Sequence, residues 1–249
     1  MTINSVKLNI FGIRGIIREF AAAIIGAVVL FTSAGTTCWG RAWIYISIAF
    51  LYQGIYISTL MIINPQLLNE RGHLNWKETK HYDKYFIIFY PIFTYASLIV
   101  AGLDVTRFKW SNIPFIMIYP GLLVFILSCA LGLWAYISNT NFILTQRNDK
   151  ISDQQVCTTG PYRYIRHPGY LAAILSSFCY PFIIGSLFSF IPVSLNIILI
   201  ILRTNYEDKT LKIELNGYDE YSRITKYMLI PHLSHQSKTM TKKDTPDGK

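Results

Sequence analysis

Five long stretches without any Asp, Glu, Lys or Arg dominate the sequence. They cover residues 20–40, 42–69, 85–103, 110–146 and 167–202. A helix needs about 20 apolar residues to cross the hydrocarbon core of a bilayer, and each stretch is near or above that length. Only 15% of the chain is charged, against about 25% in a typical soluble protein. The chain is therefore predicted to be an all-α, polytopic membrane protein, which excludes the soluble, disordered and fibrous classes.

Four of these stretches predict single spans, within residues 20–40, 42–63, 85–103 and 113–137. The first is too long, and begins too far into the chain, for the apolar region of a cleaved signal peptide, so we interpret it as a retained span. The fifth stretch exceeds one crossing and contains Pro181 and Pro192. Because proline interrupts the helical hydrogen bonds, we expect a hairpin of two short helices with its turn at Gly185 and Ser186.

The positions of the Lys and Arg residues favour this hairpin over a single long span. With a hairpin, 20 of the 23 Lys and Arg residues lie on one side of the membrane and three on the other. Because Lys and Arg residues are more frequent in cytoplasmic loops than in loops on the other side of a membrane, we predict that both termini are cytoplasmic. The same distribution explains the net charge of +9 without a nucleic-acid partner. We divide the chain into a four-span scaffold at 1–137, a region with the hairpin at 138–233, and a disordered basic tail at 234–249.

Two polar segments flank the hairpin. Residues 159–170 read TGPYRYIRHPGY, and residues 203–208 read RTNYED. The first could be an interfacial anchor belt of aromatic and basic residues. In the second, Arg203 and Glu207 share a helix face and could form an ordinary ion pair worth about 0.3–0.5 kcal/mol. Ionisable residues beside membrane spans instead favour a functional site. The four cysteines include no C-x-x-C pair, so no metal site is predicted.

These segments resemble the signature of the isoprenylcysteine carboxyl methyltransferase and phospholipid methyltransferase superfamily. The resemblance rests on residues 160–170, 203–211, 217–221 and 230–231, and residues 64–72 (NPQLLNERG) also look like those of bacterial and archaeal members. It implies an integral membrane methyltransferase that uses S-adenosylmethionine (SAM). The resemblance further implies that membrane-interface residues, rather than a Rossmann sheet, build the cofactor pocket. Residues 138–233 would then be a catalytic region with a cytoplasmic catalytic segment.

The resemblance also implies roles for individual residues. Those expected to contact the cofactor are Gln146, Gln154, Gln155, Val156, Cys157, Tyr162, His167, Pro168, Gly169 and Tyr170. Relatives often carry histidine at the position of Gln154. Glu207 corresponds to an acid that binds the ammonium group of the cofactor, and Arg203 corresponds to an arginine beside the methyl acceptor. His167 is open to two interpretations, a cofactor contact or a general base.

The charge of Arg203 favours an anionic acceptor, because a guanidinium binds carboxylates through paired hydrogen bonds and repels ammonium groups. The expected acceptor is lipophilic (prenylcysteine-like, a lipid or a small thiol) and enters sideways from the bilayer. The membrane would be the endoplasmic reticulum in a eukaryote and the cell membrane in a prokaryote. We also expect variants of Arg203 and Glu207 to fold normally, because neither residue lies in an apolar stretch.

Three alternatives stay open. A phospholipid N-methyltransferase is the nearest, because it belongs to the same superfamily. An NADPH-dependent membrane reductase is more distant, and is considered because sterol reductases have a similar C-terminal arrangement. A transporter would be expected to place ionisable residues in the middle of several spans, which the charge-free stretches do not do.

Overall fold

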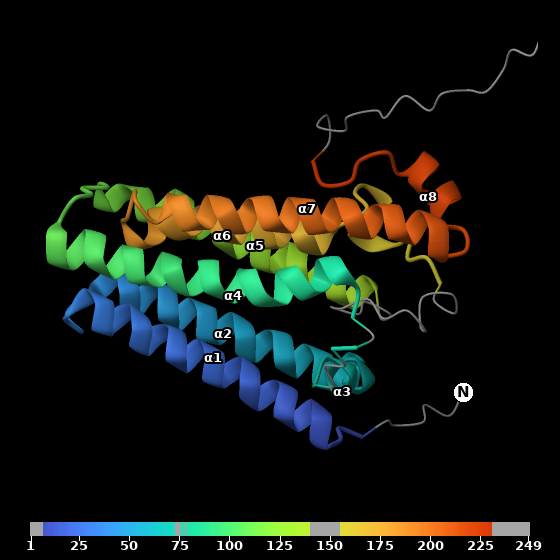
Figure 1. Ribbon diagram of the computed structural model, residues 1–249, viewed down its shortest axis with the longest axis horizontal. Helices are drawn as coiled ribbons and strands as arrows, with labels where there is room; N and C mark the ends of the chain where they lie inside the picture. Colours follow the sequence, from blue (N-terminus) through green and yellow to red (C-terminus); the bar gives the residue numbers. More distant parts are fainter. Residues whose placement is uncertain (1–6, 73–75, 78, 140–154, 231–249) are drawn as a thin grey trace, which may run out of the picture.

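The chain folds into a bundle of long helices that run roughly side by side (Figure 1). The structure is a computed structural model that describes residues 7–72, 76–77, 79–139 and 155–230. Among these residues no β-strand is found. The long helices are α1 (Ile10–Ala34), α2 (Gly40–Ile63), α4 (His81–Gly102), α5 (Ile118–Ser138), α6 (Pro168–Ile184) and α7 (Phe190–Glu214).

Short elements complete the fold. They are α3 (Pro65–Gly72), the π-helical η1 (Leu103–Phe108), the 3-10 turns η2 (Phe115–Met117) and η3 (Gly160–Arg163), and α8 (Tyr218–Ile224). The helices α3 and α8 and the last turns of α7 lie at one end of the bundle, here named the α8 end. The α1–α2, α4–α5 and α6–α7 connections lie at the opposite end, here named the far end (Figure 1).

Four helical segments are long and apolar enough to cross a membrane. They are Ile10–Ala34, Gly40–Ile63, His81–Phe108 and Phe115–Ser138. The helices α6 and α7 follow as the expected hairpin, in which α6 continues past Pro181 and ends at Ile184. Gly185 makes the turn with a φ of 90°, a left-handed conformation that glycine adopts without steric cost. The prediction of an all-α polytopic membrane protein with a C-terminal hairpin is confirmed.

The first span begins earlier than predicted. Helix α1 starts at Ile10 rather than near residue 20, and it includes Arg14 and Arg18. The side chain of Asn9 caps it by accepting hydrogen bonds from the backbone N–H groups of Phe11 and Gly12, at 2.9 and 3.1 Å. A charge-free stretch marks the part of a helix that suits hydrocarbon. It does not mark the end of the helix, because charged residues continue the helix into the interface.

Close packing joins the N-terminal spans to the hairpin. Helix α5 lies along α6, and α4 lies along α7. A Cβ atom added at Gly121 of α5 would lie only 3.1 Å from the side chain of Ile183 in α6. Small residues allow such close helix contacts where lipid removes the hydrophobic drive to associate. The contact between α4 and α7 also positions the candidate site.

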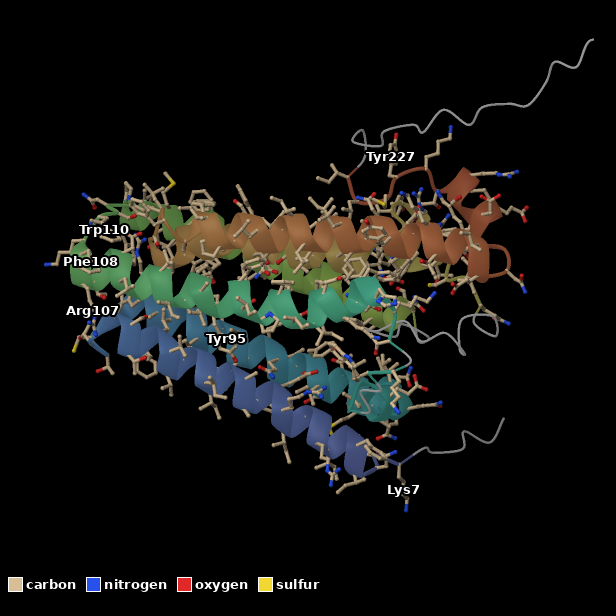
Figure 2. All side chains as sticks on the ribbon, in the orientation of Figure 1. Lys7, Tyr95, Arg107, Phe108, Trp110 and Tyr227 are labelled. Carbon is tan, nitrogen blue, oxygen red and sulfur yellow. The ribbon has the colours of Figure 1, made fainter. Side chains whose placement is uncertain are left out.

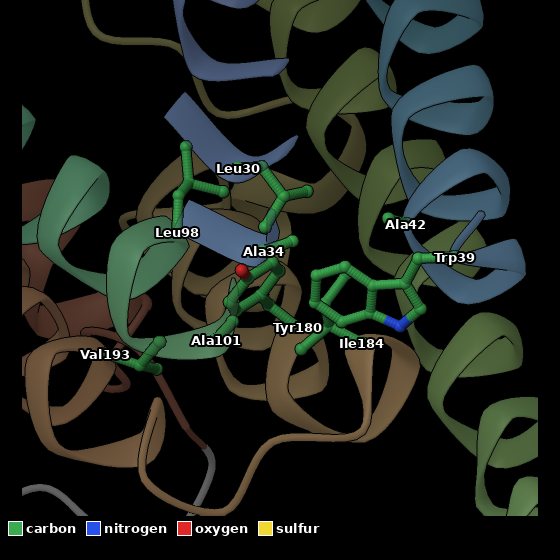
Figure 3. Close-up of a cluster of buried hydrophobic side chains, with 9 residues drawn as sticks. All are labelled: Leu30, Ala34, Trp39, Ala42, Leu98, Ala101, Tyr180, Ile184 and Val193. Atoms are coloured by element: carbon green, nitrogen blue, oxygen red, sulfur yellow. The ribbon is translucent and has the colours of Figure 1, made fainter. Parts of the chain in front are cut away.

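A buried apolar cluster fixes five helices near the far end. Figure 3 shows its side chains, which come from α1, α2, α4, α6 and α7, with Trp39 just before α2. Its members are Leu30, Ala34, Trp39, Ala42, Leu98, Ala101, Tyr180, Ile184 and Val193. Because the cluster draws on both parts of the chain, it packs the N-terminal spans and the hairpin into one core.

A buried carboxylate holds the hairpin turn at the far end. Asp104 accepts hydrogen bonds from the backbone N–H of Ser111 at 2.9 Å and of Phe188 at 3.3 Å. It also accepts one from the hydroxyl of Ser186. The side chain is fully buried, and burying a charge is costly unless it is hydrogen-bonded. Asp104 therefore ties the α6–α7 turn to the α4–α5 connection.

Aromatic and basic side chains mark both ends of the bundle. Arg107, Phe108 and Trp110 lie at the far end, and Lys7 and Tyr227 lie at the α8 end (Figure 2). The rings of Phe108 and Trp110 stack with their centroids 4.6 Å apart. Aromatic and basic residues of this kind gather at membrane–water interfaces. The two ends thus have the chemistry expected of the two interfaces.

Candidate active site

A short backbone pairing positions the start of α6. The N–H of Arg166 donates to the carbonyl of Tyr227 at 2.9 Å, and the N–H of His167 donates to the carbonyl of Met228 at 3.0 Å. Pro168 follows as the first residue of α6, where its fixed φ suits a helix start. The segment after α8 therefore returns to the GPYRYIRHPGY segment and holds it at the α8 end.

Asp208 of α7 is the centre of one buried polar cluster. Arg166 donates to its two carboxylate oxygens, from Nε at 2.7 Å and from Nη2 at 3.1 Å. The Nε2 atom of His167 lies 3.2 Å from Oδ1, and the hydroxyl of Tyr218 donates to Oδ1 at 2.9 Å. Lys212, one turn later on α7, places its Nζ 3.1 Å from Oδ2. This Asp208 cluster joins the segment between η3 and α6 to α7 and α8.

The charges around Asp208 set the protonation of the cluster. Burial alone would raise the pKa of its carboxyl, but hydrogen bonds from His167 and Arg166 hold that pKa well below its ordinary value. Burial and the neighbouring carboxylate raise the pKa of the Tyr218 hydroxyl. Asp208 is therefore an ionised acceptor at neutral pH, and Tyr218 is a protonated donor.

Arg203 forms a second buried cluster between α4, α6 and α7. Its Nε donates to Oδ1 of Asp83 at 2.6 Å, and its Nη2 lies 3.9 Å from Oε2 of Glu207. The guanidinium carbon lies 4.4 Å from the ring centroid of Phe86 and 5.2 Å from that of Tyr170, both within cation–π range. The hydroxyl of Tyr170 donates to Glu207 at 2.5 Å. Only 3% of Arg203 and none of Asp83 is exposed.

Most of the predicted site residues are near these two clusters. The hydroxyl of Tyr221 donates to the carbonyl of Tyr162 at 2.7 Å and fixes η3 against α8. The predicted residues that the structure places in or directly beside the clusters are Tyr162, His167, Pro168, Gly169, Tyr170, Arg203 and Glu207. They come from η3, α6 and α7, so the fold unites the two polar segments that flank the hairpin.

The predicted stretch before η3 is only partly described. Val156 packs against Leu215, Tyr218 and Tyr221, so it reaches the Asp208 cluster through Tyr218. Gln155 and Val156 also line an open pocket of about 770 Å³ beside α8. The thiol of Cys157 donates to the carbonyl of Ser138 at 3.2 Å. Gln146 and Gln154 lie outside the described residues.

Several residues of the clusters received no role from the sequence, among them Asp83, Arg166 and Tyr218. Asp83 lies in the N-terminal scaffold, 120 residues before Arg203. In the sequence, Asp83 was notable only as an acidic residue shortly before the charge-free stretch 85–103. Arg166 and Tyr218 stand inside the recognised motifs, but sequence spacing did not indicate that both would bind Asp208. Partners on separate helices depend on how those helices pack.

The pairing of Arg203 changes two expectations. They are the repulsion of an ammonium acceptor and the normal folding of Arg203 variants. Its guanidinium lies closer to the carboxylate of Asp83 on α4, at 2.6 Å, than to that of Glu207 on its own helix, at 3.9 Å. A guanidinium already paired with a carboxylate repels an ammonium acceptor less than a free one would. The residue is also buried, so removing it leaves Asp83 without this charge and is expected to destabilise the fold. Variants of Arg203 are therefore no longer expected to fold normally.

The charge balance fits a positively charged cofactor. In the Asp208 cluster, the carboxylate is paired with the cations of Arg166 and Lys212. Among the described residues of the Arg203 cluster, two buried carboxylates, Asp83 and Glu207, face one guanidinium. With all three groups ionised, the Arg203 cluster has one negative charge in excess. Such an excess attracts a cation strongly where the dielectric constant is low.

Comparison with known proteins gives one match. Residues 121–213 match the model of the isoprenylcysteine carboxyl methyltransferase (ICMT) family. The matched part includes α6, most of α5 and most of α7, and therefore both Arg203 and Glu207. No match was found among the curated proteins or among the solved structures.

Proposed function

Because residues 121–213 carry the features of the ICMT family, a family of membrane methyltransferases, we propose that this protein transfers a methyl group from SAM to a lipophilic carboxylate or similar anionic acceptor. The observation that supports it most is the contact between the Arg203–Glu207 segment of α7 and Tyr170 of α6. This contact brings together the two sequence segments that carry the family resemblance.

The proposed roles follow from the buried groups. SAM supplies an electrophilic methyl group. Glu207 binds its ammonium group, and Tyr170 orients Glu207 through the hydrogen bond between them. Asp83 holds Arg203 in place beside the acceptor. Transfer from a sulfonium to an anion needs no general base, so positioning of the two reactants contributes most.

His167 is better suited to positioning than to proton transfer. Its Nε2 atom is 3.2 Å from both Asp208 and the hydroxyl of Tyr218, so that nitrogen already has two partners. A general base needs a nitrogen within reach of the acceptor's proton. We therefore assign His167 to the cofactor-binding wall, together with Pro168, Gly169 and Tyr162. Gln155, Val156 and Cys157 are assigned to the same wall beside α8.

We propose a division of the chain into two regions and an orientation of the bundle in the membrane. Residues 1–137 form a scaffold and residues 138–233 a catalytic region, although Asp83 of the scaffold completes the Arg203 cluster. The α8 end faces the cytoplasm, where SAM is available. The Lys and Arg distribution supports this orientation.

One observation favours a second candidate, a phospholipid N-methyltransferase. The Asp83–Arg203 pair and the excess of buried carboxylates lower the electrostatic barrier to an ammonium acceptor. The two candidates differ in the stability of their products. A methyl ester releases methanol in mild base, whereas an N-methyl group does not.

The test is a methyl-transfer assay with SAM labelled in its methyl group. Membranes containing the protein are supplied with a prenylated cysteine or with phosphatidylethanolamine, and the extracted product is treated with base. Base-labile label in the prenylcysteine fraction is expected; stable label in the phospholipid favours the second candidate. Thermal stabilisation of the purified protein by NADPH, without stabilisation by S-adenosylhomocysteine, would instead identify a reductase.

A further inference from the structure

A cavity of about 550 Å³ lies among α1, α2 and α4. All of its lining residues fall between Glu19 and Leu98, outside the residues that match the family model. The space exists because its walls carry small side chains, among them Ala23, Ala27 and Ala49. Its volume is in the range of small-molecule sites, about 300–1,000 Å³.

The lining is mainly apolar, with polar side chains at both ends. Glu19 and Gln53 line it towards the α8 end. Leu30, Ile46 and Leu98 line it towards the far end, together with the polar side chains of Tyr45, Thr94, Tyr95 and Ser97. From Glu19 to Leu30 helix α1 rises about 16 Å, at about 1.5 Å per residue. That length is about half of the roughly 30 Å hydrocarbon core. The cavity thus extends over about the depth of one bilayer leaflet, and the charged residue of its lining, Glu19, lies towards the α8 end.

Tyr90 connects this cavity with the Arg203 cluster. Its ring lines the cavity and packs against the buried group formed by Tyr170, Ile200 and Leu229. One turn earlier on α4, Phe86 lies beneath the guanidinium of Arg203. One face of α4 therefore runs from the candidate site into the cavity.

We propose that the cavity binds the apolar chain of the methyl acceptor, so that the N-terminal spans determine which chains are accepted. This inference rests on the proposed function, because it assumes an acceptor that reacts beside Arg203. An amphiphile with its reactive group at the α8 end would direct its chain along α4 towards Leu98. Lipid tails are as apolar as leucine side chains, so selectivity comes from the shape of the cavity rather than from hydrophobicity.

The test uses a photoreactive probe, S-farnesylated N-acetylcysteine with a diazirine at the end of its chain. The purified full-length protein in phospholipid nanodiscs is irradiated with the probe, and the labelled peptides are identified by mass spectrometry. We expect labels near Leu30, Ile46 or Leu98. Unlabelled S-farnesylated N-acetylcysteine is expected to suppress them.

Two variants test the shape of the cavity. Ala49→Leu and Ala27→Leu fill it, and overpacking of this kind is expected to lower both the labelling and the kcat/KM for the farnesylated acceptor about tenfold. A short S-butylated acceptor should be affected little. Ala130→Leu, at an exposed position of α5, is the matched control. Unchanged binding of S-adenosylhomocysteine by calorimetry would show that the variants fold.

The outcomes separate this inference from the proposed function. Labels confined to the outer surfaces of α5, α6 or α7, or an unchanged chain preference in both variants, would overturn the cavity assignment. Suppression by added phospholipid but not by the farnesylated competitor would also overturn it and identify a lipid site. Labelling in the cavity without methyl transfer to any acceptor would keep the chain site and refute the methyltransferase proposal.

Discussion

At the scale of single residues, Arg203 depends on a helix that sequence analysis assigned to the scaffold. Its partner Asp83 is fully buried at the start of α4, and the rings of Phe86 and Tyr170 contact the guanidinium. An ion pair sealed in this way is costly to break from either side, because the remaining charge stays buried. The pair therefore positions Arg203 and also stabilises the contact between α4 and α7.

Breaking this pair is predicted to destabilise the protein. Asp83→Asn and Arg203→Met should each lower the free energy of unfolding by about 3 kcal/mol, measured by thermal or denaturant unfolding in detergent. The double variant should lose clearly less than the sum of the two, because neither Asp83 nor Arg203 is then left buried without the other. Strict additivity would contradict the pairing.

An exposed pair in the same chain provides the control. Arg223 and Asp219 also form an ion pair, but their side chains are 78% and 55% exposed. Exposed pairs contribute about 0–1 kcal/mol. Arg223→Met should therefore leave unfolding nearly unchanged.

Glu207 is predicted to matter for cofactor binding. Glu207→Gln removes the charge that would pair with the ammonium group, and a hydrogen bond to a charged group contributes about 1.5–3 kcal/mol. The Kd for S-adenosylhomocysteine, measured by calorimetry, should rise about tenfold or more. Glu214→Gln, in the more exposed pair with Lys80, is the control and should bind normally. Equal affinities of both variants would remove Glu207 from the cofactor site.

At the scale of elements, α7 connects membrane and active site. It begins at Phe190 beside the hairpin turn and continues to Glu214, past the apolar part. Its register fixes Arg203, Glu207 and Asp208 relative to α4 and α6. A shift of the hairpin turn along the helix axis is therefore expected to move all three together.

The hairpin turn is predicted to require glycine. Gly185 has a φ of 90°, and an added Cβ would lie 2.4 Å from Nη1 of Arg41. Gly185→Ala should lower stability by about 1–2 kcal/mol from the backbone conformation alone. Gly54→Ala is the matched control, because a Cβ there meets nothing within 4 Å; its helical position predicts a gain of about 0.5–1 kcal/mol. A stable Gly185→Ala protein in thermal unfolding would contradict this turn.

The α7–α8 junction is predicted to lose stability in acid. Asp208 has a pKa held well below the ordinary value of 3.8, so the unfolded chain binds a proton on it at a higher pH than the folded protein does. Its stabilisation is present above about pH 4 and declines as the pH falls further. Asp208→Asn should be less stable at pH 7 and lose less on acidification from pH 5 to pH 3, measured by thermal unfolding. Parallel pH profiles would contradict this role.

At the scale of the whole molecule, the two ends of the bundle are predicted to face opposite sides of the membrane. Cys38 lies in the α1–α2 connection at the far end and is exposed. The Lys and Arg distribution predicts that this end faces away from the cytoplasm. A membrane-impermeant maleimide should therefore label Cys38 in intact cells, and Cys38→Ala should abolish the label. Labelling only after permeabilisation would reverse the predicted orientation.

The sequence by itself determined the membrane-spanning architecture, the hairpin and the family resemblance. The length of a charge-free stretch, a pair of prolines and the order of GPYRYIRHPGY and RTNYED are all readable along the chain. The bounds of the first span were wrong, because α1 begins at Ile10 rather than near residue 20 and ends at Ala34 rather than near residue 40. Helix α7 is also longer than the short helix that was expected, because it continues past the apolar stretch to Glu214. Charged residues at the interface do not end a helix.

Tertiary structure alone decided the partners within the candidate site. Asp83 binds Arg203 across 120 residues, and Arg166 binds Asp208 across 42. Both pairs depend on how segments that are distant in the sequence pack together, which no local pattern specifies. The cavity among α1, α2 and α4 has the same origin, since it is a space between helices rather than a property of any one of them.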